Sequence, residues 1–143
     1  MNKLVPYLTY AGAIPFLFAL VCLAIGVDDL TIFGGVQKFL SIYTLVISSF
    51  LCGAHWGQHL LINGPWTRLL PLISNILAVL LWIFYLTLDF KPFILLCSLF
   101  FGGLLFIDYR LYNAGVLTKD YIQIRVKVSL IVMSSLLLSA ISA

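Results

Sequence analysis

The segment FLSIYTLVISSFLCGAHWGQHLL, residues 39–61, is apolar enough to cross a membrane, yet it carries polar side chains along its whole length. In an α-helix with 100° per residue, these side chains are spaced by three or four residues and share one face. The polar row consists of Ser41, Thr44, Ser48, Cys52, His55 and His59. Another face carries Gly53 and Gly57, a small-residue pair that lets a neighbouring helix approach closely. We therefore expect a central membrane helix whose polar row points into the protein rather than into lipid.

The composition of the whole chain indicates an integral membrane protein. Of 143 residues, 63% are hydrophobic and 9% are charged, and the mean hydropathy is +1.15. Soluble domains carry about 25% charged residues. The length fits a single domain over residues 1–143. The formal charge of +3 is scattered among loops, which indicates membrane topology rather than a nucleic-acid surface.

Hydrophobic runs that approach or exceed the length needed to cross about 30 Å of hydrocarbon occur five times. The predicted spans are residues 4–26, 39–61, 69–88, 92–107 and 126–143. Pro15 predicts a kink in the first span, and Asn63-Gly64-Pro65 predicts a tight hairpin between the second and third. Asn113-Ala114-Gly115 is typical of a helix end, and Thr118 is typical of an N-cap for the last helix. The predicted fold is an all-α bundle of five transmembrane helices.

The distribution of Lys and Arg predicts the orientation in the membrane. With the N-terminus inside, the six basic residues on the cytoplasmic side are Lys3, Arg68, Arg110, Lys119, Arg125 and Lys127. The opposite side holds only Lys38 and Lys91. Because the side richer in Lys and Arg is normally cytoplasmic, we expect the N-terminus in the cytoplasm and the C-terminus outside.

His55 is the foremost candidate for a ligand or proton site. A hairpin centred on Gly64–Pro65 sets His55 opposite Ser74 and Asn75, about 9 Å inside the cytoplasmic end of its helix. Ionisable groups within a span commonly mark functional sites. Polar side chains also join helices by hydrogen bonds, so His55 and Asn75 could equally fix the register of the hairpin. The full set of candidates is His55, Asn75, Ser48, Cys52 and His59.

Asp108 and Arg125 are expected to form an ion pair that ties the fourth span to the fifth. His55 and His59 have a helical spacing suited to a metal, but two ligands are too few even with Cys52, so no metal is expected. A haem would need an axial ligand from a second helix, and the chain has no third histidine. No nucleophile–His–acid set and no HExxH, Walker or Rossmann motif is present. The sequence thus predicts neither a cofactor nor an enzyme.

A pattern that spans nearly the whole chain comprises Gly12–Phe16, Ser49–Gly57, and Asp108 followed by Tyr121 and Arg125. It resembles the transmembrane protein 69-like family, a membrane domain of unknown function in bacteria and mitochondria. The most specific part is the Ser-Phe-x-x-Gly-x-His-Trp-Gly run within Ser49–Gly57.

The resemblance implies a small multi-spanning protein without an assigned activity, in a bacterial cytoplasmic (inner) membrane or, in a eukaryote, the mitochondrial inner membrane. The family-typical positions it implies are Gly53, His55, Trp56, Gly57, Asp108 and Arg125. His59 is not among them. The chain departs from the family pattern at Cys52, where glycine is expected, and by lacking a Pro-Trp pair before Tyr121.

Two functions follow as hypotheses. The first is a non-enzymatic accessory or assembly component of a membrane complex, with the Gly53 and Gly57 face packed on another subunit or on a second copy. The alternative is a small-solute or proton channel or transporter that uses His55 on the polar row. A third reading, an enzyme acting on a lipid or quinone, would need a pocket lined by His55, Asn75 and Asp108. The expected partners are the lipid bilayer and membrane protein subunits, and no nucleic acid is expected.

Overall fold

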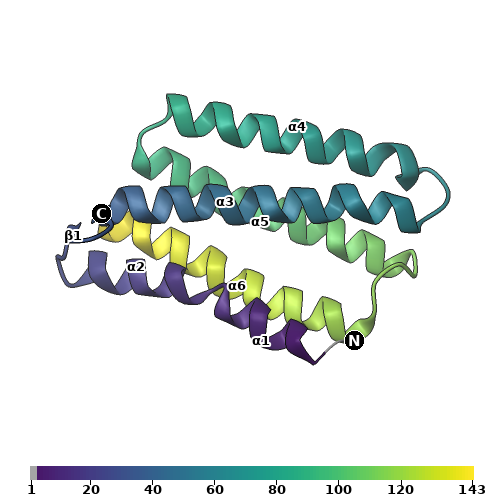
Figure 1. Ribbon diagram of the computed structural model, residues 1–143, viewed down its shortest axis with the longest axis horizontal. Helices are drawn as coiled ribbons and strands as arrows, with labels where there is room; N and C mark the ends of the chain where they lie inside the picture. The colour runs from purple at the N-terminus through teal and green to yellow at the C-terminus, as the bar shows by residue number, and fades with distance from the viewer. Residues whose placement is uncertain (1–2) are drawn as a thin grey trace.

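The chain folds as an all-α bundle of long helices that lie side by side (Figure 1). The computed structural model describes residues 3–143, and within them five helical segments are long and apolar enough to cross a membrane, as predicted. The segments are α1 with α2 (Leu4–Ala11 and Ile14–Ala24), α3 (Val36–Gln58) with the 3-10 turn η1 (His59–Leu61), α4 (Trp66–Thr87), α5 (Phe90–Asn113) and α6 (Lys119–Ser142). The start of α1 and the end of α6 lie at opposite ends of the bundle, as five crossings require.

The only strands in the described residues are two very short ones that pair within the loop before α3. β1 (Asp29–Leu30) and β2 (Gly34–Gly35) are antiparallel, in a segment predicted to be an irregular polar loop. Gly35 then precedes α3 in an extended conformation, and its neighbour Val36 is fully buried. The small hairpin therefore sets the position at which α3 enters the bundle.

Two helices extend beyond the apolar runs that were predicted as membrane spans. α5 runs to Asn113 rather than to residue 107, and α6 begins at Lys119 rather than at residue 126. Polar and aromatic residues continue both helices beyond their apolar runs, so hydropathy alone misplaces these ends. Thr118 caps α6 as predicted, because its Oγ1 accepts a hydrogen bond from the Tyr121 N–H at 3.2 Å. The positive φ of 81° at Gly115 ends the turn after α5, also as predicted.

The predicted kink in the first span is a full interruption between α1 and α2. Gly12 and Ala13 separate the two helices, and Pro15 lies in the first turn of α2, where its missing N–H is least costly. The interruption leaves backbone groups that need partners inside the membrane. Tyr43 of α3 supplies one, since its hydroxyl donates to the Gly12 carbonyl oxygen at 2.8 Å. A tyrosine from the central helix thus stabilises the break.

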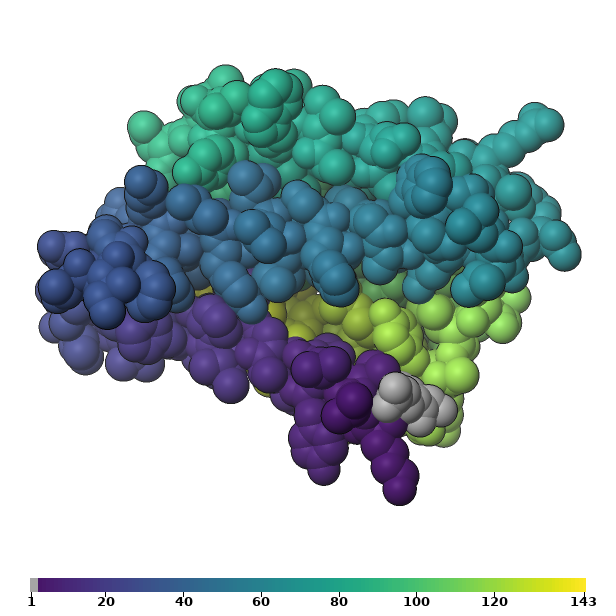
Figure 2. All heavy atoms as spheres, viewed as in Figure 1, coloured from purple at the N-terminus to yellow at the C-terminus, as the bar shows by residue number. Residues whose placement is uncertain are grey.

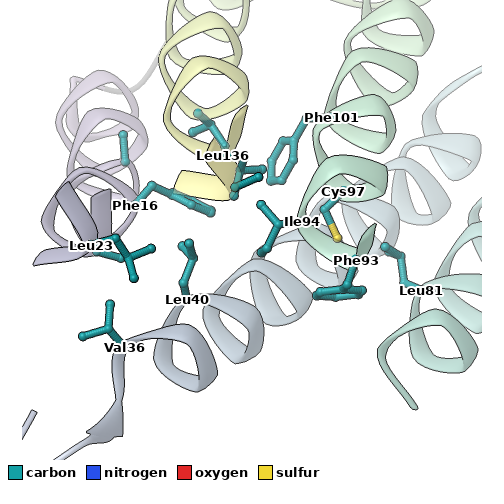
Figure 3. Close-up of a cluster of buried hydrophobic side chains, with 14 of the residues drawn as sticks. Phe16, Leu23, Val36, Leu40, Leu81, Phe93, Ile94, Cys97, Phe101 and Leu136 are labelled. Carbon is teal, nitrogen blue, oxygen red and sulfur yellow. The ribbon is translucent and has the colours of Figure 1, made fainter. Parts of the chain in front are cut away.

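The apolar core fills the end of the bundle where α3 begins, and Figure 3 shows side chains from α2 to α6 meeting there. The labelled members are Phe16, Leu23, Val36, Leu40, Leu81, Phe93, Ile94, Cys97, Phe101 and Leu136. Phe16 is fully buried and packs edge-on against Tyr43 and Phe101, with ring centroids 5.0 and 5.9 Å apart. α3 contacts α2, α4 and α5, whereas α4 packs on α3 and only sparingly on α5. The buried Asp108 and Arg125 lie with His55 toward the other end of α3, which is where the candidate site is found.

Candidate functional site

The polar row predicted on α3 faces the interior of the bundle as far as His55. Its buried members are Ser41, Thr44, Ser48, Cys52 and His55. His59 does not continue the row, because α3 ends at Gln58 and His59 begins the tighter η1 turn. The His59 ring is only partly covered, and its Nδ1–H donates to the Trp56 carbonyl oxygen. His59 is therefore separated from the buried candidates.

At the end of the row, His55 meets charged side chains from two other helices. Asp108 of α5 places Oδ1 2.7 Å from His55 Nε2, and its Oδ2 accepts a hydrogen bond from Arg125 Nε of α6 at 2.8 Å. The three residues are 4%, 1% and 6% exposed, in the order His55, Asp108, Arg125. The predicted ion pair between Asp108 and Arg125 is confirmed. The contact with His55 joins it to α3, so one carboxylate links three helices.

The protonation of this network follows from its geometry. An ionised carboxylate only accepts hydrogen bonds, so His55 Nε2 carries the proton that it shares with Asp108. Asp108 and Arg125 carry opposite charges that compensate each other. A buried ion pair is tolerated when both charges are matched and hydrogen-bonded, whereas a single unmatched charge is strongly destabilising. The network therefore stabilises the bundle only as a complete set.

The predicted contact between His55 and Asn75 is wrong. Asn75 is exposed, and its neighbour Ser74 is buried but donates to the Leu70 carbonyl oxygen of its own helix at 2.6 Å. The prediction assumed a helix that continues to residue 61 before a compact turn. In the structure, η1 and the extended Ile62 shift the register of the hairpin, so α4 does not present Asn75 to His55. The pocket required by the third reading, between His55, Asn75 and Asp108, does not form.

A crevice of about 400 Å³ opens on the side of the bundle between α1, α3 and α6, and we call it the α6 crevice. In Figure 2, yellow-green atoms of α6 are visible between the purple α1 and α2 and the blue α3. Most of its lining is apolar, including the rings of Phe16, Phe50 and Phe101. The polar part of the floor comes from α6, where Tyr121, Arg125 and Ser129 follow one another at four-residue spacing. Sequence reasoning missed this row, although its helical spacing is visible in the sequence.

The outer face of α3 carries the two glycines singled out from the sequence. A Cβ atom built on Gly53 or Gly57 would have no described atom within 4 Å, so no other helix of the chain approaches them. Ser49 lies one turn before Gly53 and is also exposed, which extends the small-residue row. Within the described residues, this face is therefore left without a closely packed helix.

Comparison with known proteins adds a family but no activity. A family described as a protein of unknown function (DUF3429) has a model that matches residues 1–141. The chain belongs to this family. No curated protein and no solved structure matches the chain. Within the described residues, no group of three or more His, Cys, Asp or Glu side chains gathers where it could hold a metal ion. For this member of the DUF3429 family, function has to be argued from the network, the α6 crevice and the outer face of α3.

The network predicts a strong coupling between Asp108 and Arg125. Replacing Asp108 by Leu leaves Arg125 buried without its counter-charge and should lower the free energy of unfolding by about 3 to 5 kcal/mol. The double variant Asp108→Leu with Arg125→Met should recover most of this loss, because it removes both charges together. Unfolding of the purified protein in detergent, followed by helical circular dichroism, measures both. A double variant that is less stable than either single variant would show that Asp108 and Arg125 do not compensate each other's buried charge.

Proposed function

We propose that this membrane protein is a non-enzymatic accessory or assembly component of a larger membrane complex, and that the outer face of α3 binds a transmembrane helix of another subunit. The observation that carries the proposal is the small-residue row Ser49, Gly53 and Gly57, of which Ser49 and Gly53 are exposed and Gly57 is partly covered with open space at its Cβ position. Helices in lipid associate through close packing rather than through a hydrophobic driving force, so small residues are typical of their contact faces. A helix face that meets only lipid has no need of such a row.

The surroundings of this row fit an apolar partner helix. Exposed Val46, Phe50 and Trp56 flank the small residues, and this stretch of α3 carries no charged side chain. The remaining faces of α3 are occupied by α2, α4 and α5, so the central helix has this one face left for a neighbour. The groove between large flanking side chains would receive a ridge of the partner helix.

The outer face predicts that a bulky residue at Gly53 disrupts assembly without unfolding the chain. Gly53→Leu has open space for its side chain, so the monomer should remain folded while the larger complex dissociates. Gly103→Leu on α5 is the matched control, because Gly103 is also exposed with no atom near its Cβ position. Native gel electrophoresis of gently solubilised membranes reports the size of the complex. If the wild-type chain migrates as a monomer, the proposal is wrong. If it migrates only as a homodimer, the partner at this face is a second copy of the chain rather than another subunit.

We also propose that the protein lies in a bacterial cytoplasmic membrane, or the mitochondrial inner membrane in a eukaryote, with its N-terminus on the cytoplasmic or matrix side. The excess of six basic residues over two supports this orientation. The resemblance to the transmembrane protein 69-like family supports the location. The test is a reporter enzyme that is active only outside the cytoplasm, fused after Ala143 and expressed in a bacterial host. It should be active, because the C-terminus is then outside. Activity of a cytoplasm-specific reporter at the same place would reverse the orientation.

A second function, proton or small-solute conduction, is favoured by the inward polar row. Ser48 Oγ in this row is buried without a hydrogen-bond partner among the described residues, and His55 ends the row in a charged network. Histidine changes charge near neutral pH, which a proton path requires. Conduction would use the row as its path across the membrane.

Conduction predicts a proton flux that depends on His55 and not on His59. In proteoliposomes, His55→Gln keeps an N–H donor for Asp108 but cannot titrate, so the flux should be abolished while the fold is retained. His59→Gln is the control, because His59 lies outside the network, and it should conduct as the wild type does. Absence of any flux in the wild type, or equal flux in His55→Gln, rules this function out.

A further inference from the structure

We propose that the α6 crevice is a binding site for a neutral lipophilic molecule that carries a carbonyl oxygen. This inference does not depend on the accessory role proposed above. It rests on two buried, unpartnered polar atoms of side chains that line the crevice, on the charge already present there, and on the apolar walls and lateral opening.

The two unpartnered atoms belong to neighbouring turns of α6. Arg125 is only 6% exposed; its Nε is bound to Asp108, but its Nη2 is buried with no hydrogen-bond partner among the described residues. Ser129 Oγ, four residues further on, is buried and unpartnered as well. Both residues line the crevice. A buried donor without an acceptor is unfavourable, so an oxygen atom placed near these two groups would be stabilised by both.

The charge of the site selects a neutral ligand. Asp108 already neutralises Arg125, so a bound anion would compete with Asp108 for the same guanidinium and place a second negative charge beside it in a buried region. A carbonyl oxygen accepts hydrogen bonds from the guanidinium and the hydroxyl without adding a charge. Carbonyl compounds therefore fit the floor better than carboxylates or phosphates.

The walls and the opening select a lipophilic ligand. A volume of about 400 Å³ lies within the range of roughly 300 to 1,000 Å³ that is usual for small-molecule sites. Leu8 and Phe50 line the crevice and are 67% and 70% exposed, so the opening faces the bilayer. Arg125 is the seventh residue of α6, about 9 Å along the helix axis from its start, and α6 exceeds the thickness of the hydrocarbon by only a few ångströms. The anchoring groups thus lie near one edge of the hydrocarbon layer, on a helix whose exposed Lys127 marks the same side.

Two kinds of membrane compound carry a carbonyl oxygen on a long apolar body: isoprenoid quinones and acyl esters. The probes are a benzoquinone with a ten-carbon tail and a short-chain diacylglycerol, added to the purified full-length protein in detergent. An alkylbenzene of the same tail length is the control without a carbonyl group. Two quantities are measured. One is the thermal stability of the protein, which should rise with probe concentration and then saturate, and the other is the equilibrium binding of radiolabelled probe. We expect saturable binding of at least one carbonyl probe, and the probe that binds identifies the source.

Two variants test the site without breaking the charged network. Ser129→Ala removes one predicted hydrogen bond to the ligand, so binding should weaken about fivefold, while the unliganded protein is as stable as the wild type or more so. Ser134→Ala, at an exposed position of the same helix, is the control and should bind normally. Ala54→Leu fills the crevice from α3 and should weaken binding at least tenfold, whereas Gly103→Leu should not.

Several results would overturn the proposal. The proposal is wrong if neither carbonyl probe binds, or if the alkylbenzene binds as tightly as the carbonyl probes. It is also wrong if both Ser129→Ala and Ala54→Leu bind the probe with wild-type affinity. Tighter binding of a fatty-acid anion than of the neutral probes would contradict the charge argument. None of these readouts involves assembly, so the crevice and the outer face of α3 are tested separately.

Discussion

The carboxylate of Asp108 is the group on which the arrangement of the bundle depends. It is 1% exposed, and each of its oxygen atoms has a different partner, His55 from α3 and Arg125 from α6. A charge at this depth is tolerable only when its partners are in place, so the contacts fix the relative positions of three helices. Apolar packing in lipid is less selective, because a leucine side chain is as well solvated by lipid as by protein. The network therefore specifies the arrangement more than the apolar core does.

The two ends of the bundle are built differently as a result. Where α3 begins, large apolar and aromatic side chains interlock around Phe16 and Leu40 (Figure 3). Toward the end of α3, the interior holds His55, Asp108 and Arg125 instead. The polar face of α3 runs through both environments, from Ser41 and Thr44 at the first end to His55 at the other. Buried leucines such as Leu70 and Leu111 pack at the second end as well, and the hydrogen-bonded charges are what distinguish it.

Sequence reasoning recovered the features that depend on local periodicity and missed those that depend on tertiary register. The five helices, the inward polar row and the break near Pro15 follow from spacing and composition within one segment. The ion pair between Asp108 and Arg125 was predicted because both residues lie at the same side of the membrane, at facing ends of consecutive spans. The contact of His55 with Asp108 spans 53 positions in the sequence, and no periodicity within one helix identifies such a partner. The same difficulty misplaced Asn75, since a small change at η1 rotates the facing helix.

Three consecutive residues of α3 connect the separate features of the molecule. Gly53 faces outward, Ala54 lines the α6 crevice, and His55 enters the charged network. Phe50, one turn earlier, both lines the crevice and flanks the small-residue row. A helix docked on that row would therefore lie against the mouth of the crevice and cover part of its opening. The proposed partner, the proposed ligand and the ion network would therefore meet at one short stretch of the central helix, and Arg125 of α6 connects the network to the crevice.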